Sequence, residues 1–297
     1  MTRRSTYHYE VVDVFTDRPL EGNPLAVFLD GSELDGSTMQ SIAQELNLSE
    51  TVFVLPATQA GCAARLRIFT PRQELAFAGH PTVGTSFVLL KRGIVPSETE
   101  RFVLEENIGP VPIRVAGQMK PLIWLTTPPI QIGQKFDRGK CANALGLGAE
   151  DLLDCEPQTV SAGNPFLFVA LKNKEAVDRA WLDLSGATLF KGAEPHPNGV
   201  FVFAHRPEGA YSRMFAPEHG IAEDPATGSA TGPLAVYMMG NHLVSGLSGT
   251  RFISEQGTKM GRRSILHVQI NGEQGVEGIE VGGHVTPLVD AEMHLGR

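Results

Sequence analysis

The 297-residue sequence contains only three cysteines, Cys62, Cys141 and Cys155, and no two of them form a Cys-x-x-Cys pair. This spacing argues against a disulfide framework or a zinc knuckle, and reduced thiols are expected. No run approaches the ~20 apolar residues that a membrane span needs. Residues 1–12, MTRRSTYHYEVV, have no apolar stretch behind their arginines, so no signal peptide is expected. The sequence predicts a cytoplasmic protein without a membrane partner.

Basic residues are too few to give the chain a positive field. Lys and Arg number 25 against 33 Asp and Glu, and the formal net charge is −8. Nucleic acids and anionic membranes attract basic surfaces, so neither is expected as a partner. Hydrophobic residues make up 42% of the chain, which is ordinary for a globular protein of one large domain or two smaller ones.

Several familiar catalytic signatures are missing as well. The chain has no GxxxxGK[ST] phosphate loop, no GxSxG nucleophile elbow and no HxH or HExxH pair. The segment 146–148, GLG, lacks the third glycine of a dinucleotide fingerprint. The segment 254–257, SEQG, is interpreted as an ordinary turn. We therefore expect neither a metal nor a cofactor.

The first half of the chain reads as strands that surround one amphipathic helix. Apolar residues recur at helical spacing over 39–46, with Ser37 as the expected N-cap and Asn47 as the end. Strands are predicted over three stretches: 7–29 (two strands), 51–55 and 65–69.

Two later segments are almost wholly apolar, and each follows an ionisable residue and a proline. One runs from Pro81 to Leu90 and the other from Ala226 to Met239. Proline suits the first position of a helix, and a helix with no polar face is expected to be buried all round.

The order of motifs in the first half recurs in the second. The matched pairs are GNP at 22–24 and 163–165, RIFTP at 67–71 with RMFAP at 213–217, and HPxxG at 80–84 with DPxxG at 224–228. Three ordered matches predict two copies of one α+β unit, each with strands curled around a central apolar helix. The halves are predicted as residues 1–120, completed by a C-terminal strand within 284–297, and residues 121–283.

The repeated motif suggests a binding site for a small acid. A helix start carries N–H groups without helical partners and the positive end of the helix dipole, and both attract carboxylates. If the halves face each other, His80 and Asp224 meet in one cleft. Glu50, in NLSETVF, stands among apolar neighbours, where burial raises the pKa of a carboxyl group toward that of a useful base.

Each of these residues also has a structural interpretation that does not involve catalysis. Glu50 fits an exposed carboxylate at a strand start, and His80 a hydrogen-bonded core histidine or cap. Asp224 fits a plain N-cap, and Ser229 a small residue that permits close packing.

The motifs GNPLAVF (22–28), NLSET (47–51), RIFTP (67–71), FAGHPTVG (77–84) and EDPATGSA (223–230) together resemble the PhzF-like family. The resemblance covers essentially the whole chain, including EQG at 255–257. It implies the diaminopimelate-epimerase-like fold, with two pseudo-symmetric domains, each a barrel-like sheet around a central helix, and a homodimer. It also implies that Glu50, His80 and Asp224 are catalytic and that Ser229 helps to hold a substrate carboxylate.

The sequence thus leads to a hypothesis of a cofactor-independent isomerase that acts on a small carboxylic acid, of the kind represented by dihydrohydroxyanthranilate. Glu50 would carry the proton, assisted by His80, while Asp224 orients the substrate. Gly79, Thr82, Gly228 and Ser229 would bind its carboxylate. An amino-acid epimerase or racemase is the alternative enzyme, although no cysteine lies beside the motifs for a two-thiol mechanism. A non-catalytic small-acid binding protein is the alternative from another class.

Overall fold

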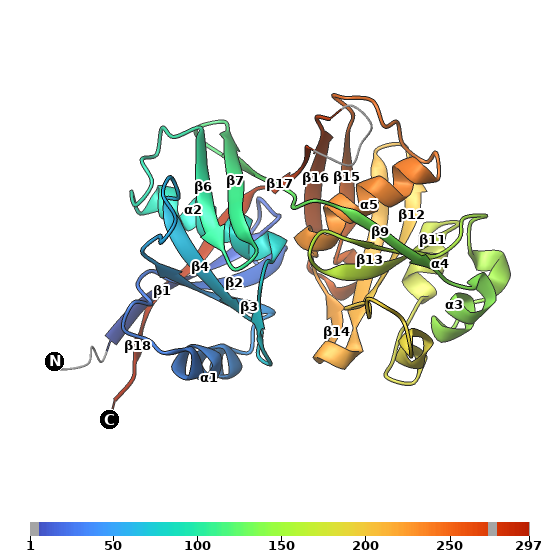
Figure 1. The fold of residues 1–297 in the computed structure, drawn as a ribbon, viewed down its shortest axis with the longest axis horizontal. Coiled ribbons are helices and arrows are strands. Elements are labelled where there is room, and N and C mark those ends of the chain that lie inside the picture. The colour runs from blue at the N-terminus through green and yellow to red at the C-terminus, as the bar shows by residue number, and fades with distance from the viewer. Residues whose placement is uncertain (1–5, 273–277, 297) are drawn as a thin grey trace. The chain divides into compact units, whose positions relative to one another are not determined.

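The computed structural model describes residues 6–272 and 278–296 and divides the chain into two compact units (Figure 1). Unit 1 contains residues up to 126 and those from 282 onward, and unit 2 contains residues 127–281. Residues 1–5, with the arginines of the N-terminal segment, lie outside the described residues. Within the described ranges, every helix is too short or too polar to cross a membrane.

The described residues of unit 1 form nine strands and two α-helices. The helices are α1 (Gly36–Leu46) and α2 (Gly79–Lys91). The strands are β1 (Thr6–Val14), β2 (Asn23–Phe28), β3 (Glu50–Leu55), β4 (Ala64–Phe69), β5 (Glu74–Leu75), β6 (Arg101–Glu106), β7 (Gly109–Ala116), β8 (Leu122–Thr126) and β18 (Val285–His294).

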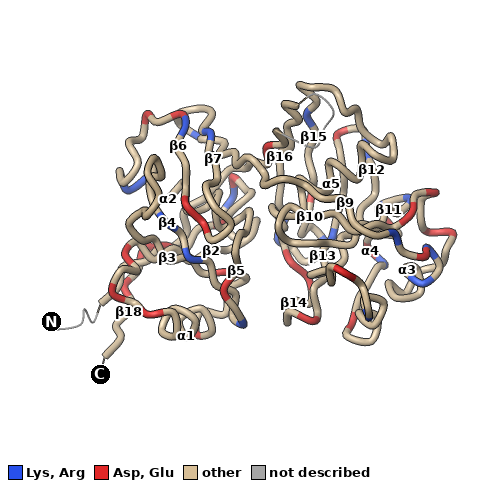
Figure 2. Tube along the Cα trace, in the orientation of Figure 1, with Lys and Arg blue, Asp and Glu red and all other residues tan. Residues whose placement is uncertain are grey.

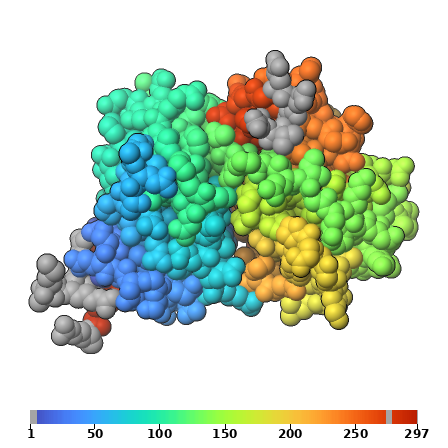
Figure 3. Space-filling view, in the orientation of Figure 1, coloured from blue at the N-terminus to red at the C-terminus, as the bar shows by residue number. Residues whose placement is uncertain are grey.

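Helix α1 lies on the surface of unit 1, as its amphipathic pattern predicts (Figure 3). Met39, Ile42 and Ala43 face the sheet, where they pack with Phe28 and Phe53. The helix ends at Asn47 as predicted, because this residue adopts the left-handed conformation with φ 49°.

The predicted N-cap of α1 is wrong. Asp35 caps the helix instead, because its carboxylate accepts the Thr38 N–H at 2.8 Å, and Ser37 already lies inside the helix.

Unit 2 is likewise built of strands and a few α-helices. Its α-helices are α3 (Arg138–Ala144), α4 (Lys174–Arg179) and α5 (Gly228–Gly240). Its strands are β9 (Gln131–Lys135), β10 (Gln158–Ser161), β11 (Pro165–Leu171), β12 (Val200–Arg206), β13 (Gly209–Ala216), β14 (Ile221–Asp224), β15 (Arg251–Gln256), β16 (Ser264–Ile270) and β17 (Ile279–Gly283), the last of which runs into unit 1 at its end. Short 3₁₀ turns occupy Ala149–Asp151, Gly186–Phe190, Pro217–His219 and Thr258–Met260.

The strands of the two units pair in the same order. In unit 1, β2 and β3 are parallel, β3 and β4 antiparallel, β4 and β6 parallel, and β6 and β7 antiparallel. In unit 2, β11 and β12, β12 and β13, β13 and β15, and β15 and β16 follow the same sequence of directions. The pairing gives the sequence repeat a structural counterpart.

The apolar helix of each unit is buried as predicted. Helix α2 packs on β1, β2, β3 and β8, and α5 packs on β10, β11 and β16. Helix α5 contains no charged residue, and the tube is tan along it (Figure 2). The large apolar area removed from water stabilises these helices despite Pro233 inside α5.

Both helix starts differ from the sequence-based prediction. Helix α2 begins at Gly79 rather than Pro81, and its first intrahelical bond runs from Thr82 N–H to Ala78 C=O at 3.2 Å. Helix α5 begins at Gly228, two residues later than expected. The prolines predicted both helix starts to within two or three residues, but not the first residue of either helix.

Candidate active site

One end of unit 1 brings together the predicted base and the predicted histidine. Glu50 is the first residue of β3, and His80 is the second residue of α2. Glu50 Oε2 lies 3.3 Å from His80 Nε2, and the two side chains are 13% and 4% exposed. Neither side chain is an exposed surface group.

Asn23 completes this cluster from the adjacent strand. It is the first residue of β2, which runs parallel to β3, so Asn23 and Glu50 lie at the same end of the sheet. Its amide nitrogen lies 3.3 Å from His80 Nδ1. An amide nitrogen can only donate, so Nδ1 accepts and the ring proton sits on Nε2, facing Glu50. The sequence motif GNP had not predicted a role for the Asn23 side chain.

His80 is neutral in this environment. Burial lowers the pKa of His80 to about 3, because a low-dielectric surrounding penalises the imidazolium form. The contact with Glu50 therefore joins a neutral ring to a carboxyl group. A neutral imidazole with a defined tautomer can pass a proton through its two nitrogens.

This neutral state predicts a pH-dependent difference in stability between the wild-type protein and a His80→Gln variant. The unfolded chain binds a proton at His80 near pH 6.5 and the folded protein only near pH 3, so wild-type stability falls as the pH drops through this window. At pH 4.5 the wild type is expected to lose ~3 kcal/mol relative to its pH 7.5 value beyond the loss seen in the variant. Urea unfolding at both pH values measures the difference, and equal losses would contradict a neutral His80.

The start of α2 offers backbone donors beside this cluster. The N–H groups of Gly79 and His80 precede the first intrahelical bond and have no partner within the helix. Thr82 is different: its hydroxyl is fully buried and lies 2.7 Å from Ala78 O and 2.5 Å from Glu106 Oε1. Thr82 thus supports the helix start from inside.

Gly84 fixes the distance between α2 and the sheet. A Cβ at this position would lie 2.6 Å from the Leu25 side chain and 2.7 Å from that of Val14. Leu25 is the residue of β2 paired with Glu50. Any larger residue at 84 would push α2 outward and draw His80 away from Glu50.

In unit 2, Asp224 and Ser229 occupy the corresponding end. Asp224 is the last residue of β14 and is 6% exposed, and its carboxylate accepts the Thr227 hydroxyl at 2.6 Å. Gly228 and Ser229 are the first two residues of α5, so their N–H groups, like those of Gly79 and His80, stand at a helix start. Asp224 is not the N-cap, because Thr227 occupies that position.

The predicted match of HPxxG with DPxxG is therefore wrong in register. The helix starts place His80 in the position of Ser229, whereas Asp224 precedes its helix by four residues. A shared proline gave the sequence match, but the first hydrogen-bonded turn defines the structural equivalence. The two ionisable residues do not occupy equivalent positions in the repeat.

Gln256, assigned to an ordinary turn from the sequence, holds the start of α5. Its Oε1 accepts the Thr227 N–H at 3.1 Å, while its Nε2 donates to Asp224 O at 2.8 Å and to Thr227 Oγ1 at 3.0 Å. The side chain is fully buried. The next residue, Gly257, has φ 75°, and a Cβ there would lie 2.6 Å from Pro225 O, so only glycine fits.

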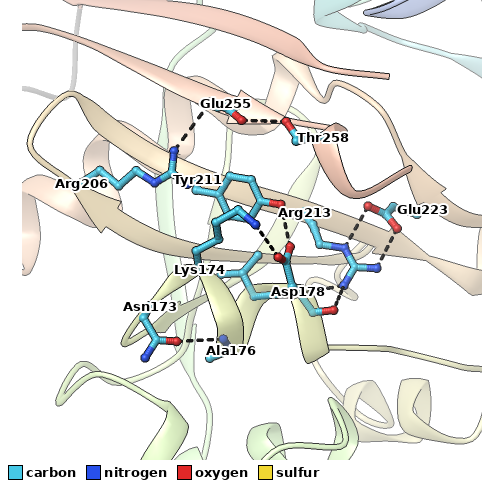
Figure 4. A network of polar contacts seen from close by, with 11 residues as sticks. Asn173, Lys174, Ala176, Asp178, Arg206, Tyr211, Arg213, Glu223, Glu255 and Thr258 are labelled. Carbon is cyan, nitrogen blue, oxygen red and sulfur yellow. Dashed lines mark hydrogen bonds and ion pairs between the residues drawn. The ribbon is translucent and has the colours of Figure 1, made fainter. Parts of the chain in front are cut away.

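A paired arginine and glutamate anchor the segment before each helix. In unit 1, Arg67 of β4 binds Glu74 of β5 through two bonds of 2.8 and 2.7 Å. In unit 2, Arg213 of β13 binds Glu223 of β14 through two bonds of 2.9 and 2.8 Å (Figure 4). The arginines are the matched residues of RIFTP and RMFAP, but the sequence did not reveal their partners.

Arg213 also connects the Asp224 segment to helix α4. Its Nη1 lies 3.0, 3.2 and 2.7 Å from the carbonyl oxygens of Val177, Asp178 and Ala180 at the end of that helix. Figure 4 shows the contact with Asp178. Cations are favourable at a helix C-terminus. Because Glu223 directly precedes Asp224, the pair holds the backbone that presents the Asp224 carboxylate.

Other chemistries find less support in the described residues. Among them, no three His, Cys, Asp or Glu side chains are arranged to hold a metal ion. Burial raises the pKa of Cys141, and of Cys155 with help from the charge of Asp154, which keeps both thiols protonated.

Sequence comparisons cover nearly the whole chain. Residues 12–291 match the PhzC-PhzF family, described as phenazine biosynthesis-like protein. The trans-2,3-dihydro-3-hydroxyanthranilate isomerase of Pseudomonas aeruginosa is 34% identical over 293 residues, which cover 97% of this chain and 100% of that enzyme. An isomerase of Mesorhizobium japonicum with an uncharacterized reaction is 37% identical over 306 residues, covering 98% and 99%.

Solved structures agree with these matches. A PhzF family protein of Bacillus anthracis has a TM-score of 0.85 at 25% identity and covers 98% of this chain and 99% of its own. A hydroxyproline epimerase of Agrobacterium vitis has a TM-score of 0.68 at 14% identity, with coverage of 100% and 95%, and so shares the fold alone. The chain has the mixed α/β fold of both groups.

Proposed function

The chain belongs to the PhzC-PhzF family and is an isomerase, and from that premise we propose that it moves a proton within a small carboxylic acid through Glu50 and His80. The observation that carries the proposal is the buried contact of Glu50 with a neutral His80, beside N–H groups that have no partner within their helix. In this proposal Glu50 is the base, His80 is the proton carrier and the helix start binds the anion.

Glu50 takes the proton from a C–H bond in this mechanism. The electron pair released from carbon shifts the substrate double bond, and the proton returns to a different carbon from Glu50, assisted by His80. Asn23 favours the His80 tautomer that carries its proton on Nε2, the nitrogen that faces Glu50. The substrate supplies its own activation, by conjugation or an adjacent carboxyl group, because an unactivated C–H bond is a poor acid.

The residues of unit 2 are proposed to act on the same molecule. The N–H groups of Gly79, Gly228 and Ser229 bind the substrate carboxylate, as helix starts bind anions generally. Asp224 accepts a hydrogen bond from an amino or hydroxyl group and so orients the ring. In this proposal the two units, which share a strand order, are the pseudo-symmetric, barrel-like domains of the diaminopimelate-epimerase-like fold.

The substrate is proposed to be a cyclic, amine-bearing carboxylic acid of the dihydrohydroxyanthranilate type. The support is the name of the Pseudomonas aeruginosa relative, the conjugation that such a ring provides, and the affinity of helix starts for a carboxylate. An epimerase of the two-thiol kind is a weaker candidate, because the cysteines lie outside the helix-start motifs and burial raises the pKa of Cys141 and Cys155.

Turnover in deuterium oxide tests the proposal. The protein is incubated with trans-2,3-dihydro-3-hydroxyanthranilate in D₂O, and proton NMR follows the ring. We expect the double bond to move and solvent deuterium to appear at a ring carbon. Inversion of a stereocentre without movement of the double bond would indicate an epimerase. Saturable binding with neither change would indicate a binding protein, and both results would contradict the proposal.

A further inference from the structure

The helix starts of the two units rest on equivalent side chains. Glu106 is the last residue of β6 and Gln256 the last residue of β15, and these strands hold the same place in the strand order. Gln256 accepts the N–H of Thr227, the N-cap of α5. The Glu106 carboxyl group lies close to the N–H of Ala78, the N-cap of α2.

The resemblance extends to a threonine hydroxyl. Gln256 donates from Nε2 to Thr227 Oγ1 at 3.0 Å. Glu106 Oε1 lies 2.5 Å from Thr82 Oγ1, which is also 2.7 Å from Ala78 O. A threonine hydroxyl has one proton, and a carbonyl oxygen has none. If the Thr82 hydroxyl donates its proton to Ala78 O, the proton between Thr82 Oγ1 and Glu106 Oε1 must belong to Glu106.

Burial supports the same assignment. Glu106 is 3% exposed, and its Oε2 has no hydrogen-bond partner among the described residues. A carboxylate with a buried, unsatisfied oxygen is costly, whereas a carboxylic acid is much less so. Burial raises the pKa of Glu106 to about 8, against the smaller lowering from its bonds with Thr82 and Ala78.

Within the described residues, no neighbouring cation offsets this burial. His80, on the helix that Glu106 supports, is neutral, and Glu50, Glu74 and Glu105 are acidic. The cations on the packed elements contact other groups: Arg65 contacts Glu105, Arg67 contacts Glu74, Lys91 contacts Glu10, and Arg114 lies over the Trp124 ring. Each cation on α2, β4, β5 and β7 thus contacts another group, and the interactions that favour an ionised Glu106 come from Thr82 and the start of α2.

We propose that Glu106 is a positioning residue held as a neutral carboxylic acid, which supports the start of α2 without placing a negative charge where a substrate carboxylate binds. It does in unit 1 what the uncharged amide of Gln256 does in unit 2. An ionised Glu106 would neutralise the positive end of the helix and repel an anionic substrate. The part that concerns substrate rests on the proposed function, whereas the protonation state does not.

The first test needs no substrate. Between the ordinary ionisation of glutamate near pH 4.5 and that of Glu106 near pH 8, the folded protein holds one proton more than the unfolded chain. Its stability must then fall as the pH rises through that window. In urea unfolding, wild type is expected to lose stability relative to Glu106→Gln from pH 5 to pH 8. The exposed-site control Glu98→Gln is expected to follow wild type.

A second readout uses the wild-type protein alone, in case the variant does not fold. With ¹³C at the glutamate side-chain carboxyl carbons, one resonance is expected to titrate near pH 8. Parallel stability profiles of wild type and Glu106→Gln, or titration of every glutamate below pH 6, would overturn the proposal.

Kinetic measurements test the part of the proposal that concerns substrate binding. For an anionic substrate, KM of the wild type is expected to rise roughly tenfold between pH 7 and pH 9 with little change in kcat, within the range of helix-end interactions. Glu106→Gln is expected to keep a flat KM. If the stability and NMR results hold but the KM profiles of the two proteins coincide, the substrate carboxylate does not bind at this helix end. Absence of any turnover would count against the proposed function, while the protonation tests would still decide the state of Glu106.

Discussion

Replacing Glu50 by glutamine is expected to lower turnover by about 10²- to 10⁴-fold, the usual contribution of general acid–base catalysis. Glutamine keeps the size of the side chain and its place beside His80, but it cannot accept a proton from carbon. The loss should therefore fall on kcat, with KM nearly unchanged. The rate of the double-bond shift and the rate of deuterium incorporation, measured by NMR in D₂O, should fall together.

Glu45 on α1 provides the matched control, because it is an exposed glutamate of the same unit. Glu45→Gln is expected to keep wild-type kinetics. The base assignment would be refuted by a Glu50→Gln protein that is folded and still incorporates deuterium at the wild-type rate. A fall in both rates that also appeared in Glu45→Gln would point to a general loss of charge rather than to a base.

Replacing Arg213 by methionine is expected to destabilise the protein by about 3–5 kcal/mol, the usual effect of removing one partner of a buried ion pair. Arg213 and Glu223 are 5% and 9% exposed, so the lone Glu223 carboxylate would remain largely buried. The carbonyl groups at the end of α4 would lose their donor as well. Urea unfolding at pH 7 measures the loss.

Two further variants make the Arg213 result specific. Arg67→Met breaks the equivalent pair of unit 1, where the side chains are 23% and 28% exposed, and a smaller loss of about 1–2 kcal/mol is expected. The double variant Arg213→Met, Glu223→Met should recover much of the stability, because no buried charge is left alone. A loss below ~1 kcal/mol in Arg213→Met would show that the pair does not anchor the Asp224 segment.

Local patterns predicted the elements that a few neighbouring residues determine. The helix ending at Asn47, the strand that begins near Glu50 and the two buried helices follow from periodicity and from residues that favour special backbone angles. Glu50 and His80 could be singled out because each is an ionisable residue set among apolar neighbours.

The missed contacts depend on partners that are distant along the chain. Glu106 and Gln256 reach helix starts 24 and 29 residues away, and Asn23 reaches His80 over 57 residues. A buried glutamate at a strand end looks the same in the sequence as an exposed one until the strand order is known. The register error between HPxxG and DPxxG has a similar cause, because a match of letters does not reveal where the first helical hydrogen bond forms.

The pairing of β1 with β18 has a consequence for how the protein is made. Their register runs from Thr6 opposite His294 to Val14 opposite Val285. On the ribosome, β1 must therefore wait until residues 285–294 have been translated, while residues 127–281 are translated earlier and can fold first. Until β18 arrives, one edge of β1 stays open to pairing with other nascent chains. The chain is thus more vulnerable to aggregation until β18 has been translated and has paired with β1.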